Sequence, residues 1–188
     1  MGLRDSLFGK KKLAEPKDDR LFALTTAAVT LDVELGLKTA GVAAISFKPQ
    51  SSGEFRAAFD EVDKLVDAVA TQCGSTVERK SDEYGYDWIV LTDPDLEDLV
   101  GTAHTLSSEL TAQGFGSQLL AAIFKFSGGA KPVYWIYGFK RGAFWPFVPA
   151  DKTTRDNALE LELKAKLEKE LPIEQDLTRW LALFDAPL

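Results

Sequence analysis

The sequence has little of what most catalytic and metal sites require. Its 188 residues include one cysteine, Cys73, and one histidine, His104. A single cysteine excludes a disulfide within the chain, and one cysteine with one histidine cannot complete a zinc site of the usual Cys/His kind. No apolar run approaches the roughly 20 residues of a membrane-spanning helix. These absences predict a cytoplasmic protein without a bound cofactor.

Catalytic patterns are also missing. Cys73 and His104 fall on different expected helices, and no neighbouring residue is placed to activate the thiol. The acidic run Asp93, Asp95, Glu97 and Asp98 has the spacing of a helix start, not of a calcium loop. Gly114-Phe115-Gly116 leads into a strand, so it does not form a phosphate-binding turn before a helix. We therefore predict a protein that is not an enzyme, with catalysis by Cys73 as the least favoured alternative.

The composition sets the class of protein. With 45% hydrophobic and 11% aromatic residues, the chain can bury a sizeable core. The formal net charge of −7 argues against a nucleic-acid-binding surface, which needs a basic footprint. The expected partner is accordingly not a nucleic acid.

Three segments differ in character: a leader at residues 1–20, an α+β domain at 21–150, and a helical extension at 151–188 docked on the same domain. The leader carries apolar residues at helical spacing and then a run of lysines: Leu3, Leu7, Phe8, Lys10, Lys11 and Lys12. One interpretation is a basic amphipathic helix that contacts the inner face of a membrane. The other is a frayed terminus whose lysines are merely solvated.

The central region alternates helix and strand patterns. Residues 21–36 fit either a strand or a helix ending at Gly36. A helix is expected from Ser51 to Gly74, with Ser51 and Glu54 as a capping box. A second helix should begin at Thr92-Asp93-Pro94 and stop at Gly114. The expected strands are 41–48, 76–80, 86–92, 118–126, 133–139 and 143–148.

The pattern as a whole predicts an α+β fold with a mostly antiparallel sheet, amphipathic helices and C-terminal helices. Pro146 cannot donate to a ladder, so the last strand is expected at an edge. Residues 151–170 read as a charged helix with favourable pairs such as Glu160 with Lys164 on its exposed side. A short final helix should dock Leu177, Trp180, Leu181 and Phe184.

The aromatic stretch at residues 114–149 is the main candidate for function. It contains no acidic residue, although the protein is acidic overall. Aromatic strands usually build cores, so both faces of strand 133–139 are expected to be covered. The alternative leaves part of this hairpin open to a partner, because interface hot spots use aromatic residues and arginine. The candidate contact residues are Trp135, Lys140, Arg141 and Trp145.

Several stretches together resemble the family of the PspA-associated protein PspAB. They run in order along nearly the whole chain: Met1-Gly2-Leu3, Tyr84-Gly85-Tyr86 with Trp88, Asp93-Pro94-Asp95-Leu96-Glu97-Asp98-Leu99, Gly114-Phe115-Gly116 with Gln118-Leu119-Leu120, Tyr137, Lys140-Arg141-Gly142, Phe144, Pro146-Phe147-Val148-Pro149, Arg155-Asp156-Asn157-Ala158-Leu159-Glu160-Leu161, and Ala186-Pro187-Leu188.

This resemblance implies a cytosolic accessory protein of the phage-shock, or membrane-stress, response. It also implies a protein partner, a PspA-like membrane-binding coiled-coil protein, and no catalytic activity. The order of helices and strands is similar, more weakly, to type III secretion chaperone-like and YbjN-like folds. We therefore expect a binding module, with peripheral membrane attachment through the leader as an alternative.

Overall fold

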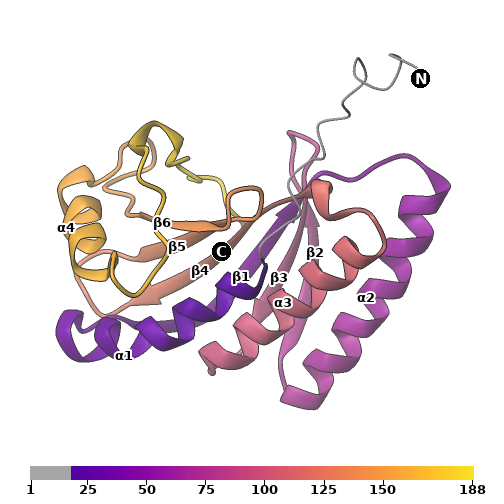
Figure 1. The fold of residues 1–188 in the computed structure, drawn as a ribbon, viewed down its shortest axis with the longest axis horizontal. Helices are drawn as coiled ribbons and strands as arrows, with labels where there is room; N and C mark the ends of the chain where they lie inside the picture. Colours follow the sequence, from indigo (N-terminus) through magenta and orange to yellow (C-terminus); the bar gives the residue numbers. More distant parts are fainter. Residues whose placement is uncertain (1–17) are drawn as a thin grey trace, which may run out of the picture.

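The computed structural model describes residues 18–188, and these build a six-stranded antiparallel sheet with helices packed on it (Figure 1). The strand order is β2-β3-β1-β4-β5-β6. The strands are β1 (Lys38–Phe47), β2 (Thr76–Ser81), β3 (Asp87–Thr92), β4 (Leu119–Ser127), β5 (Val133–Gly138) and β6 (Ala143–Phe147). The predicted α+β class is confirmed, and β6 lies at an edge as Pro146 indicated.

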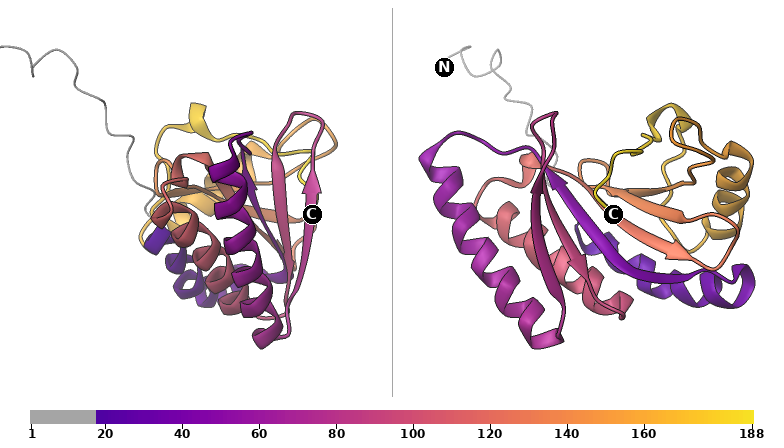
Figure 2. Two further views of the ribbon diagram at one scale, coloured as in Figure 1. Left: turned by 90° about the vertical axis from the view of Figure 1, so that its right-hand side faces the viewer. Right: turned by 180° about the vertical axis from the view of Figure 1, so that it is seen from behind.

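Three long helices cover one face of the sheet: α1 (Ala23–Leu35), α2 (Gly53–Cys73) and α3 (Leu96–Ala112) (Figures 1 and 2). The side chains of β1 show which residues point toward them, since successive strand residues face opposite sides. Phe47 packs on Phe59 of α2, with ring centroids 4.9 Å apart. The odd-numbered residues Ala43, Ile45 and Phe47 therefore face the helices, and Ser46 faces away.

Residues 21–36, whose pattern fits either a strand or a helix, contain the helix α1. Leu24, Ala27 and Leu31 are fully buried, at the three- and four-residue spacing of a helix face. Val29 and Val33, which made the strand-like alternation, are exposed on the other side. Gly36 ends the helix in the left-handed conformation, with φ at 64°.

The starts of α2 and α3 were predicted a little too early. The side chain of Ser52, not of Ser51, caps α2 by accepting a hydrogen bond from the Phe55 backbone N–H. The side chain of Asp95 caps α3 and accepts from the Glu97 N–H, so Pro94 precedes the cap. Asp93 is buried instead, and its carboxylate binds the Ser75 hydroxyl. The several capping residues in each stretch explain these small shifts.

The C-terminal part departs more from the prediction. The helix expected at 151–170 is confined to α4 (Asn157–Leu167), and Glu160 is buried, not paired with Lys164 on an exposed side. The expected final helix is only the 3₁₀ turn η3 (Leu177–Arg179), after which the chain continues without regular helix. No helix within residues 18–188 is long and apolar enough to cross a membrane.

Residues 172–188, called the C-terminal strap below, close the exposed edge of β6 and then turn back over the sheet (Figure 2). The Phe144 N–H donates to the Pro172 carbonyl at 2.8 Å, and the Glu174 N–H donates to the Phe144 carbonyl at 2.9 Å. The strap thereby satisfies backbone groups that an edge strand would otherwise leave unpaired.

Candidate functional site

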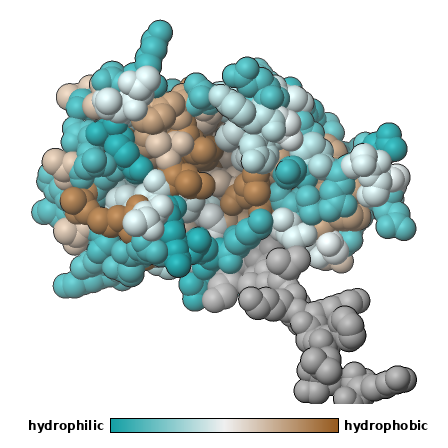
Figure 3. All heavy atoms as spheres, turned by 90° about the horizontal axis from the view of Figure 1, so that it is seen from above, coloured by the Kyte–Doolittle hydropathy of each residue, from teal (hydrophilic) through white to brown (hydrophobic). Residues whose placement is uncertain are grey.

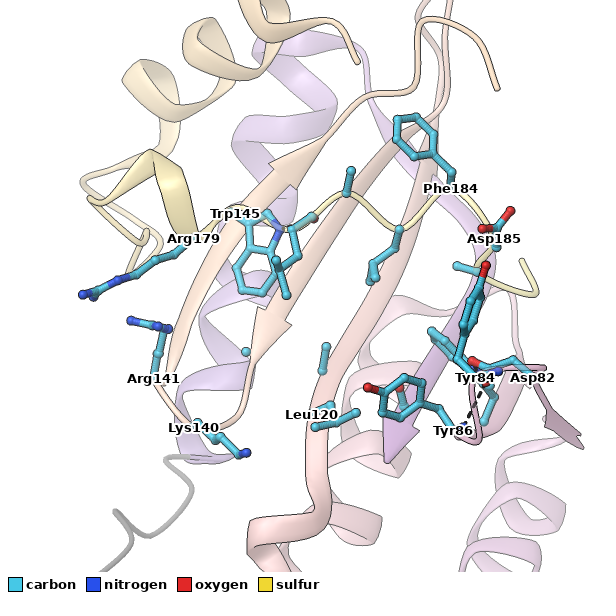
Figure 4. A pocket seen from close by; sticks show the side chains of 18 of the residues that line it. Asp82, Tyr84, Tyr86, Leu120, Lys140, Arg141, Trp145, Arg179, Phe184 and Asp185 are labelled. Carbon is cyan, nitrogen blue, oxygen red and sulfur yellow. Dashed lines mark hydrogen bonds between the residues drawn. The ribbon is translucent and has the colours of Figure 1, made fainter. Parts of the chain in front are cut away.

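A cavity of about 680 Å³ lies between the strap and the sheet face that α1, α2 and α3 leave open. Seen from above, hydrophobic residues gather in a hollowed region bordered by hydrophilic ones (Figure 3). The close view in Figure 4 places Trp145 and Leu120 in the middle of the cavity, between a cationic end and a tyrosine-bearing end. The volume is in the range of small-molecule sites in proteins.

The floor of the cavity is a row of small residues in register across the sheet. Ser46 of β1 pairs with Ala121 of β4, which pairs with Gly138 of β5. Two tryptophans bound this row, Trp88 of β3 beside Ser46 and Trp145 of β6. A Cβ atom at Gly138 would lie 2.9 Å from Cζ3 of Trp145, so only glycine lets the indole approach so closely. The hollow follows from small side chains between large ones.

Three basic residues line one end of the cavity: Lys140 and Arg141 from the β5–β6 hairpin, and Arg179 from the strap. Arg141 forms an ion pair with Glu174 at 3.3 Å, and Arg179 pairs with Asp176 at 2.9 Å. Lys140 is exposed and makes no ion pair with any of the residues that the structure describes. This lysine is therefore the charge at this end that is free to meet a ligand.

The opposite end is formed by the β2–β3 turn, which Asp82 holds together. Its carboxylate accepts hydrogen bonds from the backbone N–H groups of Tyr84 and Tyr86, each at 2.9 Å, and from Nε1 of Trp88 at 2.8 Å. Burial alone would raise the pKa of Asp82, but these hydrogen bonds outweigh it and lower the pKa below 3.8. Asp82 is thus committed to the turn, and the tyrosine rings are left facing the cavity (Figure 4).

This arrangement makes a pH prediction. Since the folded pKa of Asp82 is depressed, its stabilising effect is present above the unfolded value of 3.8 and is lost as the pH falls through the lower folded pKa. Asp82→Asn should therefore be less stable than the parent at pH 7. The difference in stability should shrink as the pH falls below the unfolded pKa of 3.8. Urea unfolding at a series of pH values measures it, and a difference that does not change with pH would contradict it.

The strap is fixed over the cavity by contacts at both ends. Nε1 of Trp145 donates to the Leu181 carbonyl at 3.0 Å, and Phe184 packs edge-on against Phe147 at 5.1 Å between ring centroids. Near the last residues, Lys80 of β2 donates to the Pro187 carbonyl at 3.4 Å. The strap thus spans the sheet from β6 to β2.

Of the four predicted contact residues, the structure brings Lys140, Arg141 and Trp145 together around the cavity. Trp135 is fully buried and cannot act as a surface contact. It follows Tyr134 and precedes Ile136 on β5, and the alternation of strand residues turns it toward the helices. Strand β5 is thus covered on both faces, as expected for an aromatic strand that builds the core.

The other predicted sites stand apart from the cavity. The candidate membrane-contact residues Leu3, Leu7, Phe8, Lys10, Lys11 and Lys12 lie outside the described residues. Cys73 ends α2, where a hydrogen bond to Asp98 raises the pKa of the thiol and so disfavours the reactive thiolate. His104 of α3 contacts Asp19 and the ring of Phe22. Within residues 18–188, no group of three acidic, histidine or cysteine residues could hold a metal ion.

Sequence reasoning missed the floor residues Ser46, Ala121 and Gly138, and it missed Arg179 of the strap. The floor could have been found only from the pairing register, because three small residues in separate strands form a row only when the sheet is assembled. No local signal in the sequence marks Arg179 as part of a site, since it reaches the cavity through the path of the strap.

These features define an α+β protein whose antiparallel sheet bears helices on one face and a strap-covered cavity on the other. Comparison with known families gives the more particular assignment. The family model described as PspA associated protein B matches residues 1–188, the whole chain, and the chain belongs to that family. No curated protein and no solved structure matches it.

Proposed function

We propose that the chain is a non-enzymatic, cytoplasmic protein-interaction module. Its partner is PspA, a coiled-coil protein of the membrane-stress response. The family's description names PspA as the associated protein, and this supports the choice of partner. The observation that carries the site is Lys140, an exposed lysine at the rim of the cavity that forms no ion pair within residues 18–188. The weaker likeness to type III secretion chaperone-like folds stays a prediction.

The rim has the physical features of a contact surface. Arg141 and Arg179 are about half exposed, and both lie within reach of Glu174, so the strap holds them beside Lys140. Beneath them Trp145 is nearly buried, which gives the rim a rigid aromatic support. Exposed cations of this kind steer and orient an acidic surface of a partner.

We expect Lys140→Glu to bind PspA about tenfold more weakly, because exchanging attraction for repulsion at an exposed site amounts to about 1–2 kcal/mol. Lys140 is preferred to Arg141 for this test, since the Arg141 ion pair with Glu174 also holds the strap. Isothermal titration with purified PspA measures the change, and the loss should diminish at high salt.

Lys64→Glu is the matched control, because Lys64 is an exposed lysine of α2, on the helical side of the sheet. It alters the net charge equally and should bind as the parent does. Equal affinities of the parent, Lys140→Glu and Lys64→Glu would place the contact elsewhere while keeping PspA as partner. No binding of PspA by the well-folded parent protein would overturn the proposed function.

A further inference from the structure

We propose that the cavity under the strap is a binding site for an anionic amphiphile, a fatty carboxylate whose head meets Lys140 and whose chain lies along the floor. This goes beyond association with PspA, since it assigns a small ligand to the protein itself. Two observations carry it: the shape and apolar lining of the cavity, and the position of its charges.

The cavity has the shape of a site for an extended chain. The hairpins at its two ends are attached to β3 and β5, which are three strand spacings apart, about 14 Å. Between them the wall consists of Leu120, Trp145, Leu183 and Phe184, with the small residues of the floor below. Apart from the Ser46 hydroxyl, the side chains of this surface offer the middle of a ligand nothing to hydrogen-bond, so the surface favours hydrocarbon.

The charges select the head group. At the hairpin end, Arg141 and Arg179 already have carboxylate partners in the strap, whereas Lys140 has none within the described chain. Lys140 directly follows Phe139, whose backbone N–H donates to the Leu120 carbonyl at 3.2 Å, so the lysine lies at the end of the cavity where the apolar wall begins (Figure 4). An anionic head at this point would pair with the free ammonium while its chain enters the hollow.

The opposite end has less charge with which to hold a cationic head, because Asp185 is the one exposed carboxylate among the described residues that line the cavity, against three basic residues at the hairpin end. The Asp82 carboxylate is occupied by three N–H donors of its own turn. The negative charges of Glu83 and, after it, Asp185 raise the pKa of the Tyr84 phenol, so Asp185 lies near that ring. The rings of Tyr84 and Tyr86 are instead suited to contact the end of an apolar chain.

The test uses the isolated full-length protein and three probes: dodecanoate, dodecyltrimethylammonium and acetate, all below micelle-forming concentrations. Trp145 and Trp88 line the cavity, so intrinsic fluorescence reports its occupation. We expect saturable binding of dodecanoate with a raised unfolding temperature, at least tenfold weaker binding of dodecyltrimethylammonium, and none of acetate.

Two variants locate the site, and one serves as control. Lys140→Gln should weaken dodecanoate binding about fivefold. Leu120→Trp should abolish it by filling the hollow; Leu120 is only half buried, so the larger ring is tolerated by the fold, which thermal unfolding checks. Lys64→Gln, on α2, should bind dodecanoate as the parent does.

Equal binding of the two long-chain probes, or undiminished binding by Leu120→Trp, would overturn the proposal. A concentration-dependent dimer that excludes dodecanoate would do the same, because a second copy would then occupy this face. PspA is absent from every measurement, so failure here leaves the proposed partner binding untouched, and failure of PspA binding leaves this site untouched.

Discussion

Replacing Arg155 by alanine should lower the free energy of unfolding by about 3–5 kcal/mol, because it strands a buried carboxylate. Glu160 of α4 is 2% exposed, and Nε of Arg155 donates to both of its oxygens, at 3.0 and 2.8 Å. Without the guanidinium, this charge would have no opposite charge beside it. Urea denaturation at pH 7 measures the difference in unfolding free energy directly. In a separate thermal unfolding experiment, the melting temperature should fall by about 10 °C.

The same arginine joins three parts of the chain, so its loss should also release the strap. Its Nη1 group donates to the Trp180 carbonyl at 2.7 Å, and its guanidinium lies over the ring of Phe147, 5.6 Å from the centroid. Glu160 in turn accepts a hydrogen bond from the Val148 N–H at 2.8 Å. The pair thus ties the end of β6, α4 and the strap together, and the cavity depends on it.

A matched control and a double variant separate charge from packing. Arg56→Ala removes an exposed arginine of α2 whose side chain, among the described residues, hydrogen-bonds only to the Ser51 carbonyl, at 3.3 Å. This change should alter stability by no more than about 0.5 kcal/mol. Arg155→Met with Glu160→Leu removes both charges and should recover part of the loss. The recovery should be incomplete, because the Val148 N–H loses its acceptor when Glu160 is replaced by leucine. A loss below 1 kcal/mol for Arg155→Ala would contradict the buried-pair argument.

Most of the sheet and the long helices were predicted from periodicity, because their signals are local. The stripe from Phe55 to Val69 identifies α2. The turn residues Lys140-Arg141-Gly142 identify the start of β6, and Pro146 within it indicates an edge strand. The C-terminal part was predicted poorly for the opposite reason. The charge of Glu160 suggested a solvated face, whereas its burial depends on Arg155 and on the backbone of Val148.

The candidate site was predicted in part, and the errors have a common physical cause. Lys140, Arg141 and Trp145 stood out by composition, and the structure places them around one cavity. Trp135 stood out equally but is buried under the helices, since a strand pattern gives two faces without saying which is covered. The floor residues Ser46, Ala121 and Gly138 have no signal until the register is known.

The turn between β4 and β5 offers the second large stability effect. Gly128 has φ at 131°, a conformation that side chains with a Cβ rarely adopt. A Cβ atom there would lie 1.9 Å from the backbone carbonyl oxygen of Gly36, which ends α1. Because the clash is with backbone and not with a flexible side chain, Gly128→Ala should lower the free energy of unfolding by about 3 kcal/mol or more.

The neighbouring glycine is the matched control for this change. A Cβ atom at Gly129 would meet only the Leu37 side chain and the Lys131 carbonyl, at 3.8 and 3.9 Å, and its φ is not in the positive range. Gly129→Ala should therefore stay within about 0.5 kcal/mol of the parent in urea unfolding. If the two variants lost equal stability, the cost would come from the turn in general. A loss confined to Gly128→Ala would instead show that the end of α1 packs directly on the turn, which helps to hold α1 on the helical face of the sheet.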